Sequence, residues 1–110
     1  MKYIGNGSDQ NMIRGTTPTL KFTLPFSTEL LAEAYVTLSQ NKKVVVDKSL
    51  EECEVSGNKL SVKLKQADTL LLDSDHKTEI QVRAKLNSGD AVASRIVTVS
   101  TERILKDGEI

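Results

Sequence analysis

The fold is decided by the stretch Lys77–Ile104, which has the sequence KTEIQVRAKLNSGDAVASRIVTVSTERI. In its first half apolar side chains alternate with polar or charged ones; the apolar set is Ile80, Val82, Ala84 and Leu86, and the intervening set is Glu79, Gln81, Arg83 and Lys85. A period of two is typical of a β-strand with one buried and one solvated face. The turn Asn87-Ser88-Gly89-Asp90 follows, and its Ser-Gly pair accommodates the positive φ angles of a tight hairpin. We therefore predict an antiparallel hairpin of two strands, Lys77–Asn87 and Asp90–Arg103.

The second strand of this hairpin has an interruption in its alternation. Ala91, Ala93, Val97 and Val99 share a parity, but Arg95 falls among them. Two explanations are open: a bulge near Arg95 shifts the register, or the strand moves to another sheet at that point.

Short alternating segments separated by turn residues fill the chain before the hairpin. These predicted strands are Met12–Leu24, Ala34–Gln40, Lys43–Asp47, Cys53–Val55 and Lys59–Lys65. The segment Gln66–Leu72 breaks the period and predicts a helical turn that closes one end of the sheets. About seven short strands, with turn signals roughly every 8 to 12 residues, predict an all-β fold: an antiparallel immunoglobulin-like β-sandwich with one short helical turn. A small open barrel is the runner-up.

The predicted domain spans residues 12–105, between an N-terminal arm (1–11) and a C-terminal tail (106–110). The arm carries few apolar groups, so by itself it is expected to be flexible. Alternatively it orders against a neighbouring subunit, with Tyr3 and Ile4 as anchors. A third interpretation takes Met12 as the native start. The tail is expected to be exposed.

Composition disfavours several classes of partner. The chain has 15 basic and 15 acidic residues and a formal net charge of +0, without the surplus of Lys and Arg that nucleic-acid binding needs. Its one cysteine, Cys53, cannot form an internal disulfide, which favours a reducing cytoplasm. No apolar run approaches the roughly 18 residues of a membrane span, and the N-terminus does not have the pattern of a signal peptide. We expect a soluble chain made in a reducing cytoplasm, with neither nucleic acid nor membrane as partner.

The pattern of reactive residues predicts no enzyme, no cofactor and no metal site. His76, the only histidine, follows Asp73-Ser74-Asp75, but Glu79 is too close to serve as the distal ligand of a cation loop. Cys53 lies between two glutamates, which disfavour its thiolate, and its parity with Val55 predicts an inward, unreactive thiol. An enzyme or metal protein that uses His76 is the rival hypothesis, and an unchanged His76→Ala variant would dispose of it.

Three stretches together resemble a known group of proteins. Met12–Pro18 leads into a strand that ends in Leu24-Pro25-Phe26, Leu64–Leu70 joins a strand to a helical turn, and Glu79–Val99 forms the hairpin. This arrangement resembles small hypothetical structural proteins of phages and prophages of Firmicutes. It is similar in layout to the N-terminal β-sandwich modules of phage baseplate and tail accessory proteins. The likeness covers residues 12–105.

The resemblance implies a virion protein of the head, neck, tail or baseplate, without catalytic residues. Its expected partners are other virion proteins or copies of itself, as a homo-oligomer or particle component. Sheet edges and terminal segments are the natural places for such contacts. The candidate contact residues are Tyr3, Ile4, Ile13, Arg14, Leu105 and Ile110. The alternative is a carbohydrate- or host-surface-binding module, but the scarcity of exposed aromatic residues weighs against it.

Overall fold

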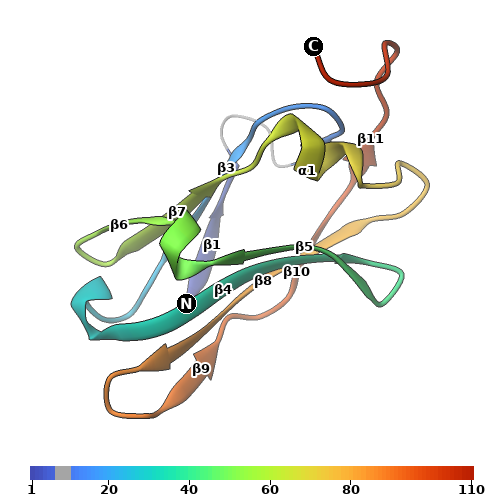
Figure 1. Ribbon diagram of the computed structural model, residues 1–110. Coiled ribbons are helices and arrows are strands. Elements are labelled where there is room, and N and C mark those ends of the chain that lie inside the picture. Colours follow the sequence, from blue (N-terminus) through green and yellow to red (C-terminus); the bar gives the residue numbers. More distant parts are fainter. Residues whose placement is uncertain (7–10) are drawn as a thin grey trace.

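The computed structural model describes residues 1–6 and 11–110. Half of the chain lies in strands and a tenth in helices (Figure 1). The strands are β1 (Lys2–Gly5), β2 (Met12–Ile13), β3 (Thr19–Thr23), β4 (Leu31–Gln40), β5 (Lys43–Ser49), β6 (Glu54–Ser56), β7 (Lys59–Lys63), β8 (Thr78–Leu86), β9 (Ala91–Ala93), β10 (Val97–Val99) and β11 (Thr101–Glu102). The predicted helical turn is α1 (Gln66–Leu70), and two 3₁₀ turns, η1 (Thr28–Leu30) and η2 (Leu50–Glu52), accompany it.

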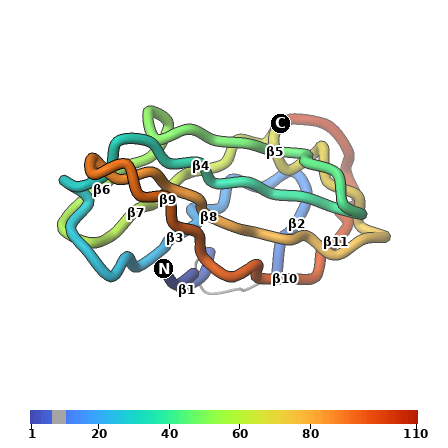
Figure 2. Tube along the Cα trace, turned by 90° about the horizontal axis from the view of Figure 1, so that it is seen from below, coloured from blue at the N-terminus to red at the C-terminus, as the bar shows by residue number. Residues whose placement is uncertain are grey.

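The strands form two antiparallel sheets and one small parallel pair. The four-stranded sheet has the order β1-β3-β7-β6, and the five-stranded sheet has the order β10-β8-β4-β5, with β9 also paired to β8. Figure 2 shows β5, β4, β8 and β10 following one another across the molecule. A parallel pair, β11 with β2, connects a segment near the N-terminus to one near the C-terminus.

Both sheets contribute to one hydrophobic core, as in a β-sandwich. The alternation predicted from the sequence decides which side chains enter it, because every second residue of a strand points to the same face. The four-stranded sheet supplies Leu20, Phe22, Leu60 and Val62, and the five-stranded sheet supplies Ala34, Val36, Leu38, Val46, Ile80, Val82 and Ala84. The all-β, antiparallel character expected from the sequence is therefore confirmed.

The predicted hairpin lies at the centre of the five-stranded sheet. β8 pairs with β4 on one side and with β9 and β10 on the other. The turn closes through hydrogen bonds from the Leu86 N–H to the Asp90 carbonyl (2.8 Å) and from the Gly89 N–H to the Leu86 carbonyl (2.8 Å). Gly89 has φ of 94°, the positive value expected for this turn.

The interruption near Arg95 is a bulge within the same sheet. Arg83 pairs with Ala93 and Ile80 with Val97, so three steps along β8 face four steps along the returning strand. The Ser94 hydroxyl accepts a hydrogen bond from the Val82 N–H (3.0 Å), and the Ser94 N–H donates to the Val82 carbonyl (2.9 Å). These bonds satisfy the backbone where the extra residue disrupts the ladder. The strand leaves this sheet only at Thr101, where it pairs with β2.

The expectation of a flexible N-terminal arm is wrong for Lys2–Gly5. These residues form β1, which pairs antiparallel with β3 at the edge of the four-stranded sheet. The Tyr3 ring packs on Phe22 with the ring centroids 5.2 Å apart. From its composition, the segment was expected to be too polar to order. Burial of the Tyr3 ring offsets the entropy that is lost when the segment becomes ordered. Residues 7–10 of the predicted arm lie outside the described residues.

Candidate protein-contact surfaces

The C-terminal segment 103–110 exposes apolar side chains while it is held against the domain. Leu105 is 91% exposed and Ile110 is 89% exposed. Gln66 of α1 makes two hydrogen bonds to the Ile110 backbone: its Nε2 donates to the carbonyl oxygen (3.1 Å), and its Oε1 accepts from the N–H (2.9 Å). Residues 106–110 are exposed, as expected from the sequence. The segment nevertheless has a defined position over α1 (Figure 1).

Arg14 also holds the C-terminal segment, and its guanidinium is already engaged within the molecule. Its Nε donates to the Leu72 carbonyl (2.8 Å) and its Nη2 donates to the Leu70 carbonyl (3.1 Å), at the end of α1. The Nη2 atom also forms an ion pair with Asp107 of the tail at 3.5 Å. These bonds use the guanidinium within the molecule, so the structure assigns Arg14 an internal role.

The other predicted contact residues with defined strand positions are Tyr3 and Ile4 in β1 and Ile13 in β2, and they differ in exposure. Tyr3 points inward to Phe22, whereas Ile4 on the same strand is 43% exposed. Ile13 is half-buried in β2, where it pairs with Glu102. The structure therefore brings Arg14 and Ile110 together around α1, and places Tyr3 and Ile4 in a separate region of the four-stranded sheet.

The outer face of the five-stranded sheet is a second candidate surface. From the sequence, its residues were interpreted as an ordinary solvated face. We define this outer face by the outward side chains of Glu33, Tyr35, Thr37, Ser39, Val44, Asp47, Ser49, Glu51, Glu79, Gln81, Arg83, Lys85, Ala91, Ala93 and Ile96. Strand register places them in rows: Tyr35 lies between Ser49 and Arg83, and Lys85 lies between Glu33 and Ala91. The alternation at β4 and β8 indicated which residues point outward, but not that both strands occupy the middle of one sheet.

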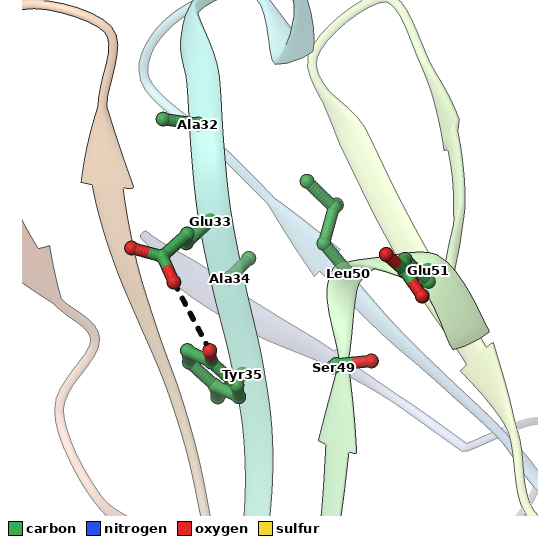
Figure 3. A pocket seen from close by; sticks show the side chains of 7 residues that line it. All are labelled: Ala32, Glu33, Ala34, Tyr35, Ser49, Leu50 and Glu51. Atoms are coloured by element: carbon green, nitrogen blue, oxygen red, sulfur yellow. Dashed lines mark hydrogen bonds between the residues drawn. The ribbon is translucent and has the colours of Figure 1, made fainter.

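Two shallow hollows meet at Tyr35 on the outer face. The first has a volume of about 290 Å³ and is lined by Ala32, Glu33, Ala34, Tyr35, Ser49, Leu50 and Glu51 (Figure 3). It exists because β4 continues to Leu31 while its pairing with β5 ends at the Tyr35–Ser49 pair. The second hollow, of about 190 Å³, lies on the β8 side of Tyr35 and includes Arg83 and Lys85.

Carboxylates dominate the electrostatics on one side of Tyr35. Its hydroxyl donates to Glu33 Oε1 at 3.2 Å, as Figure 3 shows. This hydrogen bond, the charge of Glu33, desolvation and the more distant charges of Asp47 and Glu51 all raise the pKa of Tyr35. Arg83 and Lys85 lie on the other side, and neither forms an ion pair within the described part of the chain. Charges of both signs are therefore mixed around Tyr35, because Glu33 pairs with Lys85 and Glu79 lies on β8 with Arg83.

The reactive residues singled out in the sequence are not gathered into a site. His76 lies in an open depression with Asp75 and Glu79. In residues 1–6 and 11–110, no three His, Cys, Asp or Glu side chains are grouped to hold a metal ion. The Cys53 thiol is half-buried, donates to the Ser49 carbonyl (3.3 Å), and has a pKa raised to about 11 by burial and by the charge of Glu52. The thiol is therefore protonated at neutral pH. The predicted inward position is only partly correct, because Cys53 is half-buried and Val55, with which it shares a parity, is 46% exposed.

Comparison with known proteins yields no relative. No protein-family model, curated protein or solved structure matches this chain significantly. Among the described residues, no helix is both long enough and apolar enough to cross a membrane.

Proposed function

We propose that this chain is a non-catalytic structural or accessory protein of a phage virion, acting through protein–protein contacts in the assembled head, neck, tail or baseplate. The observation that carries the proposal is the C-terminal segment, in which Leu105 and Ile110 are about nine-tenths exposed on a backbone tied to α1. The resemblance of residues 12–105 to phage and prophage structural proteins supplies the setting. The partners are other virion proteins or further copies of the chain.

The anchoring of this segment favours a contact role. Burial of a Leu or Ile side chain in an interface stabilises a complex by about 1.5–3 kcal/mol. A free tail loses part of this gain to the ordering of its backbone, whereas a segment already held in place loses less. The bonds from Gln66 to Ile110 and the ion pair from Arg14 to Asp107 hold the segment before any partner binds.

We also propose the immunoglobulin-like type for the sandwich. The orders β1-β3-β7-β6 and β10-β8-β4-β5 correspond to the A-B-E-D and G-F-C-C′ sheets of that architecture. The parallel pair of β2 with β11 fits a first strand that divides between the two sheets. Such sandwiches are scaffolds for many functions, so the proposed role depends on the exposed surfaces and not on the fold.

The test is to measure incorporation of the chain into particles. Phage particles from a culture that carries the gene are purified by density, and the chain is quantified by mass spectrometry. The Leu105→Asp, Ile110→Asp double variant should fold normally, because both positions are exposed. It should nevertheless be depleted from particles at least about 10-fold, because a charge would be desolvated at the contact.

Val55→Asp is the matched control, since Val55 is an exposed apolar residue, at 46%, on the distant edge strand β6. This variant should be incorporated like the wild type. Absence of the wild-type chain from particles, or equal incorporation of the double variant, would refute the proposal.

A carbohydrate- or host-surface-binding module is the second candidate. The observation in its favour is Tyr35, an exposed ring that is hydrogen-bonded to Glu33 and shares the hollow of Figure 3 with Glu33 and Glu51. A sugar could stack on the ring while its hydroxyls donate to the carboxylates. A glycan array that shows no binding would dispose of this candidate, whereas binding lost in Tyr35→Ala would support it.

A further inference from the structure

The outward side chains of the four-stranded sheet are mostly lysines and small hydroxyl residues. Its inward positions belong to the core, as Leu20, Phe22 and Leu60 do, so the intervening positions of β1, β3, β7 and β6 form an outer face. We call this surface the lysine face; its outward residues are Lys2, Thr19, Lys21, Thr23, Glu54, Ser56, Lys59, Ser61 and Lys63. Four lysines and one glutamate give it a net charge of +3 (four minus one).

Strand pairing gathers the four lysines into one patch. Thr23 pairs with Lys2 on one side and with Lys59 on the other. Lys21 pairs with Ser61, which lies between Lys59 and Lys63 along β7. At roughly 3.3 Å per residue along a strand and about 4.8 Å between strands, their Cα atoms fall within an area about 13 Å long and about 10 Å wide. Three separate segments of the chain therefore contribute to a single concentration of positive charge.

None of these lysines is neutralised by an ion pair within residues 1–6 and 11–110. All four are exposed, and the ion pairs of the described residues involve only Arg14 and Lys48 as cations. Glu54, the acidic residue of the face, lies on the edge strand β6. The net charge of the whole chain is +0, so the excess on this face is balanced by acidic residues elsewhere. The total charge, which disfavoured nucleic acid as a partner, therefore does not describe this face.

The composition of the lysine face favours a polyanion over another protein. Lysine is depleted in the cores of protein–protein interfaces, where aromatic and other anchoring side chains supply most of the binding energy. The outward residues of this face include no aromatic side chain, and the apolar residue at its margin is Ile4, in the bulge of β1. Binding of lysines to a polyanion is instead driven by the release of counterions and requires no apolar contact.

We propose that the lysine face binds the phosphate backbone of a nucleic-acid duplex, without preference for sequence. A lysine ammonium is a compact point charge that suits a single phosphate. The hydroxyls of Thr19, Thr23 and Ser61 lie between the lysines and can donate hydrogen bonds to further phosphate oxygens. A duplex is favoured over a single strand, because proteins that bind single strands stack the bases on aromatic side chains.

This interaction uses no residue of the C-terminal segment. It therefore goes beyond the proposed function, and the two can be tested separately.

Four phosphate contacts predict weak binding that depends strongly on salt. For B-form DNA, the logarithm of the association constant falls with the logarithm of the salt concentration by about 0.9 per neutralised phosphate, so four lysines give a slope of about −3 to −4. Between about 50 and 200 mM salt the affinity should therefore fall about 100-fold. At physiological salt the dissociation constant should be about 10⁻⁴ M, at the weak end for non-specific binding.

Fluorescence anisotropy of a short labelled DNA duplex, titrated with the full chain from about 20 to 200 mM salt, tests the proposal. The wild type should bind two duplexes of unrelated sequence equally. A variant with Lys2→Gln, Lys21→Gln, Lys59→Gln and Lys63→Gln should bind at least about 10-fold more weakly at the lowest salt, with a slope near zero. Each of these substitutions alone should reduce the slope by about one, which provides the same test if the four-fold variant is unstable.

The matched control is a variant with Lys42→Gln, Lys43→Gln, Arg83→Gln and Lys85→Gln. It makes the same change in net charge at exposed positions of the five-stranded sheet and of the turn between β4 and β5. Because distant charges are screened by salt, this variant should bind within about 2-fold of the wild type. Equal midpoints of urea unfolding would show that both variants are folded.

Three results would overturn the proposal: a wild-type chain that does not bind the duplex at about 20 mM salt, a control variant that loses as much affinity as the variant of the lysine face, or a strong preference for one sequence. Binding of polyglutamate without binding of the duplex would assign the lysine face to an acidic protein and would equally refute it.

Discussion

Tyr3 shows how far the role of one residue can differ from what its neighbours in the sequence suggest. It belongs to a polar N-terminal segment, yet its ring packs against Phe22. Its buried hydroxyl has no hydrogen-bond partner among the described residues, and burial raises its pKa from 10.0 to about 12. A buried hydroxyl without a partner is a cost to folding, whereas the ring is a gain.

The pKa of Tyr3 predicts a loss of stability in alkali. The unfolded chain releases the phenolic proton near pH 10, whereas the folded chain retains it to about pH 12. The unfolded state is therefore increasingly favoured as pH rises through this range, and the free energy of unfolding falls. Cys53 acts in the same direction, since its pKa is raised from 9.0 to about 11.

Tyr3→Phe should be as stable as the wild type at pH 7, or more stable, and should lose less stability between pH 9 and pH 11. Urea unfolding at several pH values measures this difference. Tyr35→Phe, which removes the hydroxyl of an exposed ring, is the control and should have a smaller effect. A Tyr3→Phe variant whose stability declines as steeply as that of the wild type would contradict the assignment.

At the scale of elements, β1 is the strand that sequence reasoning missed. It forms the edge of the four-stranded sheet, where Tyr3 pairs with Phe22 and Lys2 with Thr23. Its four residues include few apolar side chains, so a window of local sequence contains no periodic signal for it. The stabilising contact of the Tyr3 ring is with Phe22, which lies 19 positions further along the chain.

Deletion of residues 1–6 should therefore lower the stability of the domain. The loss of the Tyr3 ring and its aromatic contact is expected to cost about 2–4 kcal/mol. Chemical denaturation measures the cost, and Ile4→Ala, at a position 43% exposed, should cost much less. An unchanged unfolding midpoint after deletion would instead support the sequence-based interpretation of a dispensable arm with Met12 as the start.

At the scale of the whole molecule, the buried amide of Gln40 joins segments that are distant in the sequence. Its side chain, at the end of β4, is 5% exposed. Its Oε1 accepts from the Asp73 N–H (2.7 Å), and its Nε2 donates to the carbonyls of Asp73 (2.8 Å) and His76 (3.2 Å). The hydroxyls of Thr78 and Thr101, 2.6 Å apart, complete the cluster and connect it to β11.

Gln40→Leu should lower the free energy of unfolding by about 1–3 kcal/mol or more, because it leaves buried backbone groups of the Asp73–His76 turn without partners. Thermal or urea unfolding measures the change. Gln81→Leu is the control, since the half-exposed Gln81 amide donates one hydrogen bond, to the Ser94 carbonyl at 2.9 Å. Equal stability of Gln40→Leu and the wild type would show that the cluster does not hold the turn.

The same difference between local and distant information explains which parts of the candidate surfaces could be predicted. Exposure of Ile110 was predicted, because it belongs to the polar tail of residues 106–110. The bonds of Arg14 to Leu70 and Leu72 could not be predicted, because the residues they join are 56 and 58 positions apart. The outer face was overlooked for a similar reason: its side chains belong to β4, β5, η2 and β8, and the order of the strands across the sheet does not follow the order of the chain.

The sequence by itself determined the all-β class, the hairpin of β8 and its return strand, the interruption near Arg95 and the helical turn after β7. Each depends on the alternation of side chains or on turn residues, which act over a few neighbouring positions. Tertiary structure alone decided that β1 completes a sheet, that β2 pairs with β11, and that Tyr35 lies between Ser49 and Arg83 on one face. Strand pairing joins residues far apart in the chain, and the free energy that selects one pairing arises only when both sheets bury their apolar faces together.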